Sequence, residues 1–568
     1  MKKNLKNLKI IFGQTRPIQI IGMIAVSGFM AILEALTISL VLPFIVVLTN
    51  HSDSSAWRLL ETWAERTVPA LKDHLLISTG SILLFFFLFK NAFGMCGTSL
   101  QLRWVFALKR KCFQRLVKIY SELSFTQLRK YSASHLVQTL GLELNRLFDR
   151  LVLGMLIGIS EGFVLLAVLS VLFYLNWAAA LSCLALIGVT SIVYLKFLSD
   201  RVSALGVEHQ TAEHDVVKMG FQFFQSIREM LIYQTSETLV SKYVGVQRKL
   251  ENSIRRYLEF SELPRYLIEV LSIACLLIVC FFLILQNGAR EAIPASLGVF
   301  AVGLFRILPS LHRIGSSIHS FNFAKPSLNR IARELQDSTT YSATHLPQSI
   351  HSPSFKNEIR IEEVTYQYPD THKNLFQPVT AQIKKGTSCG ISGQSGIGKS
   401  TLLDILMGLV PPSQGRITID GIDLKNFNRA WFHLLGLVPQ NVSVLEASVM
   451  ENVTFGRLDF SRSQVIEALE QAKLTEWWKS LPQGLETPLN REEYLSGGQR
   501  QRLGLARALV RSPEIIILDE FTSALDEELE QEILETVLTL KNSPTIFLVS
   551  HHEKCLKRCD QQLRLISL

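Results

Sequence analysis

The chain has 568 residues and a formal net charge of +9, and 48% of its residues are hydrophobic, which gives a positive mean hydropathy of +0.24. This composition excludes a single small soluble domain, because the length has room for several domains and the hydropathy is unusually high. The positive charge does not favour a nucleic-acid partner. Lys and Arg cluster beside apolar runs, as in "MKKNLKNLK" and "LKRKCFQRLVK", where membrane helices would meet the cytosol.

Long apolar stretches occupy the chain up to about residue 320. A helix that spans a membrane needs about 20 mostly apolar residues. Six stretches qualify, at 17–49, 74–107, 140–175, 177–200, 258–286 and 292–320. Several exceed the bilayer requirement, so we expect the helices to continue into the cytosol. The sequence therefore predicts an all-α membrane domain of six helices over residues 1–335.

Two polar, helix-compatible segments, 108–139 and 201–257, lie between the apolar stretches. The distribution of basic residues places both on the cytosolic side. Short helices within 120–132 and 216–230 are candidates for docking onto a cytosolic domain, near Gln440.

The composition changes after residue 335. A stretch rich in Ser and Thr, with two prolines, predicts a linker over 336–357. Short apolar strands then alternate with helices and charged turns, beginning with "EIRIEEVTYQY". We predict a soluble α/β domain over 358–568.

A glycine-rich loop follows the strand-like "SCGIS" and opens the helix-like "STLLDILMGL". It fits G-x-x-x-x-G-K-[ST], whose glycines let backbone N–H groups surround the phosphates of ATP. Lys399 would neutralise the β- and γ-phosphates, and the Ser400 hydroxyl would bind Mg²⁺. The predicted ATP-binding residues of this loop are Gly393, Gln394, Ser395, Gly396, Ile397, Gly398, Lys399, Ser400 and Thr401.

The stretch "EIIILDE", residues 514–520, predicts a buried parallel strand that ends in two carboxylates. In open α/β sheets, ligands bind at the carboxyl ends of the strands. We expect Asp519 to hold Mg²⁺ and Glu520 to orient or deprotonate the attacking water. The alternative, an acidic pair that caps a helix, is disfavoured by the phosphate loop.

The stretch "LSGGQ" accompanies these two motifs, and together they resemble the ABC-type ATPases throughout residues 358–568. The resemblance implies that this signature stretch contacts the ATP held by a second, head-to-tail subunit. Such a stretch needs no catalytic group, because the catalytic groups lie in the other subunit. The implied residues are Leu495, Ser496, Gly497, Gly498 and Gln499.

Further residues match the same family pattern. Tyr368 resembles the aromatic residue that stacks on adenine, whereas Tyr366 is expected to pack in the sheet. Gln440 resembles the loop glutamine that touches Mg²⁺ and senses the membrane domain. Asp526, at the end of "SALD", matches the loop that crosses to the partner, and His551 resembles the histidine that contacts the γ-phosphate.

Two features depart from the family pattern. The segment "TPLNREEYLSGGQ" lacks the V-G-E-x-G-like sequence that contacts the membrane domain in exporters, and Glu492 or Glu493 is expected to substitute for it. The chain also stops at "LRLISL", short of the usual final strand and helix. Neither departure removes a catalytic group.

Six helices before one such ATPase domain resemble an ABC half-exporter, which implies ATP and Mg²⁺ as ligands and a multi-pass protein of the bacterial inner membrane. Both catalytic motifs are intact, which favours a homodimer with two competent sites over a heterodimer. Ionisable residues near bilayer depth tend to mark substrate pathways. Arg306 and Arg313 are therefore candidates for a basic cavity that binds lipid phosphate or diphosphate. Further ionisable candidates are Arg265, Glu269, Lys90 and Arg103.

The segments "ELPRYLIEV" and "LFRILPSL" resemble flippases of the PglK type, which move lipid-linked oligosaccharides. The alternative for the arginines is a structural role in ion pairs such as Arg265 with Glu269. Alternative functions are an exporter of peptide, lipid A or hydrophobic drugs, and a non-transporting regulator or channel built on the same fold.

Overall fold

The computed structural model describes residues 2–13, 16–48, 75–129, 131–285, 293–344, 355–368, 373–489, 495–521, 527–540, 543–550 and 552–567. They divide into two compact units. The helical unit contains Met1–Leu123 and Lys130–Tyr341, and the α/β unit contains Ser124–Arg129 and Ser342–Leu568.

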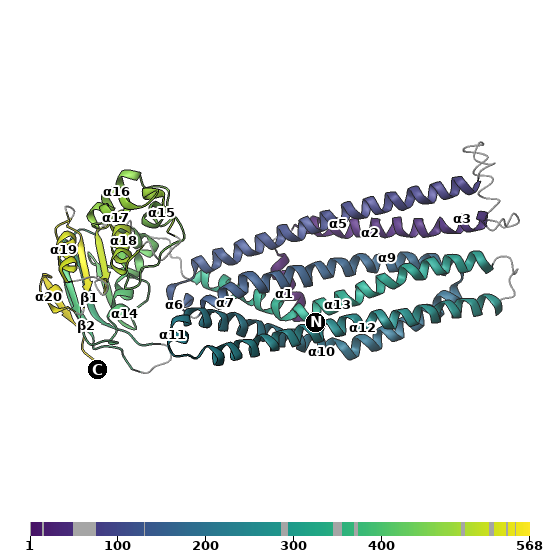
Figure 1. The fold of residues 1–568 in the computed structure, drawn as a ribbon, viewed down its shortest axis with the longest axis horizontal. Helices are drawn as coiled ribbons and strands as arrows, with labels where there is room; N and C mark the ends of the chain where they lie inside the picture. Colours follow the sequence, from purple (N-terminus) through teal and green to yellow (C-terminus); the bar gives the residue numbers. More distant parts are fainter. Residues whose placement is uncertain are drawn as a thin grey trace. The chain divides into compact units, whose positions relative to one another are not determined.

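Long helices run side by side in the helical unit (Figure 1). Each apolar stretch predicted to span the membrane overlaps at least one of them. Four described segments are long and apolar enough to span a membrane, at Pro17–Ser39, Leu76–Glu122, Ala133–Tyr174 and Ser236–Phe282, and Trp177–Val189 is a shorter apolar helix. The principal helices are α1 (Lys2–Phe12), α2 (Pro17–Ser39), α3 (Val41–Leu48), α5 (Leu75–Glu122), α7 (Ala133–Val137), α9 (Leu153–Leu175), α10 (Trp177–Gln225), α11 (Ile227–Ile232), α12 (Ser236–Leu285) and α13 (Ile293–Thr344).

Local sequence explains where several of these helices begin. Pro17 starts α2, a position where its missing N–H costs nothing. Asn176 has extended backbone angles that end α9, and its side-chain oxygen accepts a hydrogen bond from the Ala179 N–H at 3.1 Å. This single residue therefore separates two long helices that would otherwise read as one apolar run.

The chain between α7 and α9 departs from regular α-helix. Two π-helical segments, η2 (Gln138–Glu143) and η3 (Leu147–Val152), flank the short α8 (Leu144–Arg146). Glu143 is fully buried there and lies within 3.5 Å of both Arg146 and Arg330. The sequence did not predict these segments, because π-helical stretches are rare and occur mostly as single turns inside α-helices.

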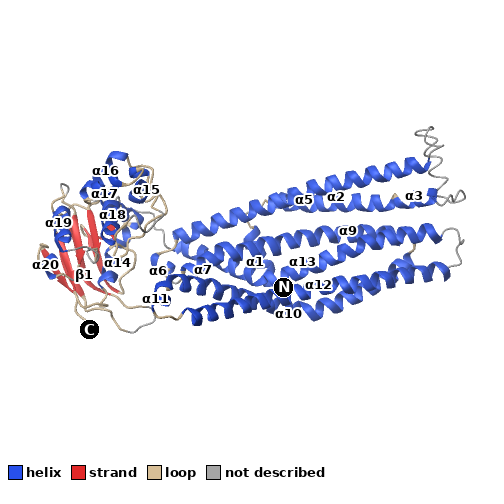
Figure 2. Ribbon diagram, in the orientation of Figure 1, coloured by secondary structure: helices blue, strands red, loops and turns tan. Residues whose placement is uncertain are grey.

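Two sheets form the centre of the α/β unit (Figure 2). The antiparallel sheet has the order β2-β1-β4-β5, and the parallel sheet has the order β6-β7-β8-β3-β9. Their bounds are β1 (Glu358–Thr365), β2 (Val379–Lys384), β3 (Ser388–Ser392), β4 (Gln414–Ile419), β5 (Ile422–Asp423), β6 (Leu435–Val438), β7 (Ile515–Asp519), β8 (Thr545–Val549) and β9 (Gln561–Arg564). Four of the five residues of β7, and all five of β8, are buried, as a parallel strand covered on both faces requires.

Helices cover both faces of the parallel sheet: α14 packs in the hydrophobic core on one face, and α18, α19 and α20 pack in the core on the other. Their bounds, with those of the smaller helices, are α6 (Phe125–Leu128), α14 (Lys399–Leu406), α15 (Val449–Thr454), α16 (Arg462–Gln471), α17 (Thr475–Ser480), α18 (Gly497–Leu509), α19 (Glu527–Leu538) and α20 (Glu553–Leu556).

The short helix α6 belongs to the α/β unit although it lies between α5 and α7 in the chain. Phe125 packs against the hydrophobic core of this unit, and the Arg129 guanidinium lies 3.8 Å from the Asp404 carboxylate on α14. Within the α/β unit, this segment therefore contacts the helix that follows the phosphate loop.

The domain boundaries remain a prediction, and the region predicted as a linker differs in part. Helix α13 continues to Thr344, because neither proline nor glycine interrupts the chain between Gln336 and Pro347. Residues 345–354, the middle of the predicted linker, lie outside the described residues.

Candidate functional site

The loop after β3 has the backbone of a phosphate cradle. Gly393, Gly396 and Gly398 have φ values of 155°, 79° and 103°, which residues with side chains rarely adopt. A Cβ added at Gly398 would lie 2.3 Å from the side chain of Leu375, so no larger residue fits there. Gly398 also caps the N-terminus of α14, where free N–H groups and the helix dipole favour an anion.

Two side chains of α14 lie beside this loop. Lys399 is only 6% exposed, and its Nζ donates a hydrogen bond to the Gly393 carbonyl at 3.0 Å. The Ser400 hydroxyl donates to Oδ1 of Asp519, at the end of β7, at 3.3 Å. Burial raises the pKa of Asp519, and the hydrogen bond from Ser400 opposes that shift. A hydroxyl and a carboxylate at this distance are an oxygen pair that suits Mg²⁺.

Glu520 follows Asp519 in a left-handed backbone conformation, with φ of 47°. Its N–H donates to the Val549 carbonyl at 3.0 Å, which ties this strained residue to β8. Oε2 of Glu520 accepts a hydrogen bond from the Gln440 side chain at 2.6 Å. The structure therefore brings Gln440 and Glu520 together, 80 residues apart in the chain.

Gln501, which the sequence analysis did not select, holds Gln440 in turn. Its Nε2 donates to the Gln440 carbonyl at 2.6 Å, while its Oε1 is buried without a hydrogen-bond partner among the described residues. Gln501 lies on α18, the helix that begins with the signature stretch. Its position in "LSGGQRQR" was the available signal, but a polar residue inside a helix is usually solvated, so the sequence alone did not point to a contact.

The two tyrosines before the phosphate loop have different environments. The Tyr368 ring is 40% exposed, and its hydroxyl lies 3.3 Å from that of Thr401. Tyr366 packs against the hydrophobic core, and its ring meets that of Tyr368 edge-on, with centroids 5.3 Å apart. An exposed ring beside the phosphate loop is consistent with the adenine contact expected of Tyr368, which remains a prediction.

The signature stretch is a helix N-terminus. Ser496 caps α18, and Ser496 and Gln499 form a reciprocal capping box. Leu495 is buried at 7% exposure. Gly497 and Gly498 occupy the first turn, where backbone N–H groups have no partner in the helix. Such a helix N-terminus favours an anion, and the contact of this stretch with the ATP of another subunit remains a prediction.

Several predicted residues lie outside the described part of the chain. They are Asp526, His551, Glu492 and Glu493. His552, next to His551, is described, and its Nδ1 lies 3.4 Å from Oε2 of the buried Glu530 on α19.

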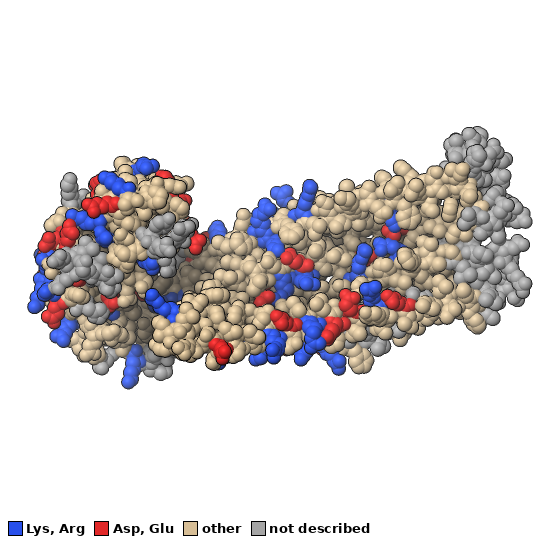
Figure 3. Space-filling view, in the orientation of Figure 1, with Lys and Arg blue, Asp and Glu red and all other residues tan. Residues whose placement is uncertain are grey.

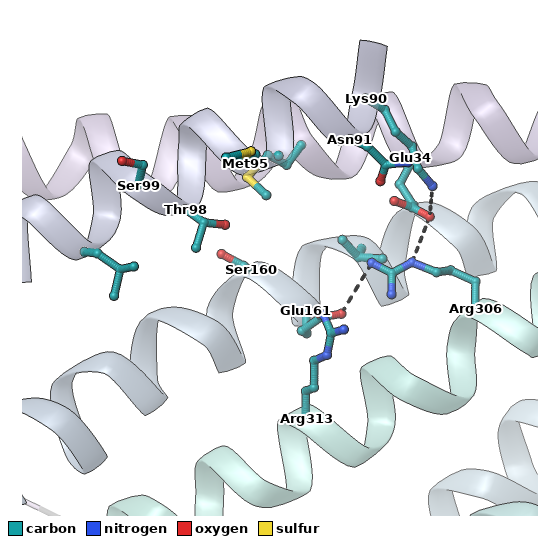
Figure 4. Close-up of a pocket in the computed structure, with 14 residues that line it drawn as sticks. Glu34, Lys90, Asn91, Met95, Thr98, Ser99, Ser160, Glu161, Arg306 and Arg313 are labelled. Carbon is teal, nitrogen blue, oxygen red and sulfur yellow. Dashed lines mark hydrogen bonds and ion pairs between the residues drawn. The ribbon is translucent and has the colours of Figure 1, made fainter. Parts of the chain in front are cut away.

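The helical unit contains a polar pocket of about 550 Å³. Arg306 and Arg313 of α13 line it, together with Lys90 of α5 (Figure 4). Glu34 of α2 and Glu161 of α9 also line it, and these carboxylates pair with the three cations.

The sequence analysis missed both carboxylates. The rule that selected the arginines, an ionisable residue at bilayer depth, applies equally to Glu34 and Glu161 in their apolar helices. Arg265 and Arg103 do not line the pocket. Arg265 instead pairs with Glu269 at 3.5 Å, the ion pair that the alternative named, and both side chains are more than 60% exposed.

Comparisons with known proteins identify the domain that carries this site. Residues 376–523 match the family model for the ABC transporter domain. A solved structure of a bacterial Atm1-family ABC exporter with ATP bound superposes with a TM-score of 0.79, over 96% of this chain and 95% of that one. The identity is 19%, so the superposition establishes the fold alone. The chain has the architecture of an ABC half-exporter.

Two curated relatives match most of the length of this chain. The heterocyst differentiation ATP-binding protein HepA of Nostoc sp. is 26% identical, over 98% of this chain and 91% of its own. An ATP-dependent lipid A-core flippase of Idiomarina loihiensis is 24% identical, over 89% of this chain and 86% of its own.

Three predictions are confirmed by these findings. The chain has a helical membrane part and an α/β ABC ATPase domain. The ABC domain makes the chain an ATP hydrolase whose turnover is coupled to transport. It is a multi-pass protein of the inner membrane, with its ATPase domain in the cytoplasm.

Proposed function

We propose that the half-exporter is a flippase that uses ATP to move a polyprenyl-diphosphate-linked oligosaccharide across the membrane. The observation that carries this proposal is the pocket of the helical unit, lined by Lys90, Arg306 and Arg313. Three cations against two carboxylates leave one positive charge. Each ionisable group at bilayer depth costs roughly 2.5–3.5 kcal/mol to insert, so a retained group implies a use. An anionic headgroup on a lipid fits this charge.

The lining around the ionic groups suits an amphipathic cargo. Asn91, Thr98, Ser99 and Ser160 offer hydrogen-bonding groups, of the kind that sugar hydroxyls require. Met30, Met95, Leu102 and Val164 are the apolar part of the same lining. Phosphate, sugar and lipid thus each have a counterpart in one cavity.

ATP supplies the energy in this proposal. Lys399 and the amides of the cradle would hold the phosphates, while Ser400, Gln440 and Asp519 would hold Mg²⁺, which polarises the phosphoryl group. Glu520 would orient the attacking water and accept its proton. The signature stretch of a second copy would complete each site, so the working form would be a homodimer. Binding of ATP by both copies would favour one orientation of the helical units, and hydrolysis would release it.

A lipid A-core cargo is the second candidate. It is favoured by the relatives described as lipid A-core flippases, one of which covers 89% of this chain. Both candidate cargoes are glycolipids with phosphate, so the pocket alone does not separate them.

The test is the ATPase activity of the purified protein in nanodiscs. The polyprenyl-diphosphate oligosaccharide, lipid A and a hydrophobic peptide are titrated separately. We expect stimulation by the oligosaccharide lipid. Stimulation by lipid A alone would replace the cargo by the second candidate, and stimulation by peptide alone would refute a phosphate-binding pocket. If the wild type hydrolyses no ATP, and Glu520→Gln therefore causes no loss of ATPase activity, the protein is a non-transporting regulator.

A further inference from the structure

The ionic groups of the pocket form one continuous chain across four helices. The order is Lys90, Glu34, Arg306, Glu161 and Arg313, and Figure 4 shows these side chains pointing toward one another. Lys90 donates to Glu34 at 2.7 Å, and Arg306 donates to the same Oε1 at 2.8 Å. The carboxylates are nearly buried, with side-chain exposures of 10% for Glu34 and 8% for Glu161.

The two arginines have different positions in this chain. Arg306 is 24% exposed and reaches both carboxylates, with 2.8 Å to Glu34 and 3.8 Å to Glu161. It therefore joins α13 to α2 and α9, and removing it would leave two buried carboxylates short of a cation. Arg313 is the last member of this series of ionic groups. Its side chain is 54% exposed, and Glu161 is its one ion-pair partner among the described residues. Arg313 is thus the cation that the pocket presents to a ligand.

Glu161 is anchored independently of Arg313. The Ser310 hydroxyl donates to Oε2 of Glu161 at 2.7 Å, while Arg313 donates to Oε1 at 2.5 Å. If Arg313 turned away, Glu161 would keep both Ser310 and Arg306. The ion pair between Glu161 and Arg313 is therefore the one that a ligand can separate at the smallest cost in free energy.

We propose that Glu161 is a specificity-determining counter-ion, which a cargo must displace from Arg313 in order to bind. The inference rests on the proposed function, since it takes the pocket as the cargo site. A phosphodiester, the group found in bulk phospholipids, carries one negative charge and gains little by replacing a carboxylate. A diphosphate or a phosphomonoester carries more charge and forms paired hydrogen bonds with a guanidinium, so it displaces Glu161. The pocket then selects a highly charged lipid phosphate against the surrounding membrane.

The test compares two probes in nanodiscs of zwitterionic lipid. The first is polyprenyl diphosphate without its glycan, whose Kd is measured directly. The second is phosphatidylglycerol, added as a competitor. We expect the wild type to bind the diphosphate and phosphatidylglycerol to compete poorly. In Glu161→Gln, the amide keeps the shape and the Ser310 hydrogen bond but loses the charge. We expect it to bind the diphosphate about fivefold more tightly, the upper end for removing one competing ion pair with an exposed partner, and to admit phosphatidylglycerol as a competitor.

The matched control is Glu259→Gln, which removes the same charge from an exposed pair with Arg255 on α12, outside the pocket. It should leave both measurements unchanged. A double-mutant cycle with Arg313→Gln provides the second arm. If Glu161 acts through Arg313, the gain from Glu161→Gln disappears in the Arg313→Gln background.

Failure of the inference and failure of the proposed function give different results. Wild-type binding of the diphosphate with no change in Glu161→Gln, or with a gain that persists without Arg313, overturns the counter-ion role. The same pattern of variants seen with lipid A in place of the diphosphate supports the role and changes the source of the phosphate. A wild type that binds neither lipid refutes the proposed function itself. Should Glu161→Gln fail to fold, unaltered diphosphate binding by Arg313→Gln refutes the proposal.

Discussion

Two adjacent carboxylates at the end of β7 differ in surroundings and in expected role. Asp519 is partly buried beside Ser400, and burial raises its pKa. Glu520 turns away in a left-handed conformation and meets Gln440. A position that costs folding energy and still keeps a carboxylate is typical of a functional group.

The raised pKa of Asp519 predicts the effect of neutralising it. A carboxyl whose pKa is higher in the folded than in the unfolded state lowers stability as pH rises through that interval, and the cost remains at pH 7. We therefore expect Asp519→Asn to raise the melting temperature of the nucleotide-free protein while abolishing Mg²⁺-dependent ATP hydrolysis. Thermal unfolding and ATPase assays on the same preparation check this. A lower melting temperature would contradict the assignment of burial as the dominant cause.

Gln501 predicts a loss of turnover without a loss of ATP binding. It fixes the carbonyl of Gln440, whose side chain contacts Glu520, and among the described residues it has no hydrogen bond to the phosphate loop. Gln501→Leu should lower kcat roughly tenfold, within the range of a displaced catalytic group, with little change in the KM for ATP. Gln471→Leu, on α16 and outside the site, is the control. A raised KM with normal kcat would show that Gln501 supports nucleotide binding instead.

Part of this site could be predicted from residue spacing, and part could not. The phosphate loop and the carboxylates after β7 lie where a strand meets a turn, so local pattern located them. The contacts of Gln440 with Glu520 and Gln501 join segments 80 and 61 residues apart. Such contacts depend on strand order, which no local pattern contains. Glu34 and Glu161 were missed because the sequence analysis expected a basic cavity and did not include the carboxylates that neutralise its arginines.

Helix α6 is the element that we expect to transmit conformational change to the α/β unit during transport. It lies between two long helices in the chain, yet Phe125 packs in the core of the α/β unit and Arg129 lies beside Asp404 on α14. Burial raises the pKa of Asp404, and the nearby Arg129 opposes this shift. Helix α14 carries Lys399 and Ser400, so a force on α6 has a short path to the phosphate loop.

We expect Arg129→Ala to separate hydrolysis from transport. Its side chain is 58% exposed, so the loss of the ion pair should cost less than about 1 kcal/mol of stability. Basal ATPase activity should remain near that of the wild type, whereas cargo moved per ATP should fall several-fold. Reconstituted vesicles in which both rates are measured provide the check, with Lys118→Ala on α5, whose partner Glu122 is on the same helix, as the control. Equal losses of both rates would contradict a coupling role.

The sequence predicted the type of each element better than the residue at which the element ends. Apolar length identified the long helices, the alternation of short apolar strands with helices predicted the α/β domain, and the motifs carried its resemblance to the ABC-type ATPases. The helical continuation to Thr344 could not be predicted, because a polar sequence without proline or glycine is compatible with either helix or linker. The π-helical segments on either side of Leu144 could not be predicted either, because such segments are rare and occur as short stretches inside α-helices.

At the scale of the molecule, charge is distributed as a membrane transporter requires. Basic and acidic side chains gather over the middle of the long helices, while the surface toward α3 is largely free of charge on the face that Figure 3 shows. Many large apolar side chains of the helical unit are exposed, including Phe85, Leu88 and Phe281. A surface of this kind is stable only against lipid or another protein. The motif set and the apolar runs were enough to predict this architecture. The proposed cargo site is a pocket shared by four helices, which no local pattern contains.

The most direct test of the central claim is ATP-driven flipping in proteoliposomes. The cargo is a polyprenyl-diphosphate-linked oligosaccharide, and the wild type is compared with Glu520→Gln. We predict that the wild type moves this lipid only with ATP and Mg²⁺, and that the variant is slower by roughly 10²–10⁴-fold, the contribution of a general base. Equal rates in the two proteins, or a wild type that moves lipid A or peptide but not this lipid, would contradict the account.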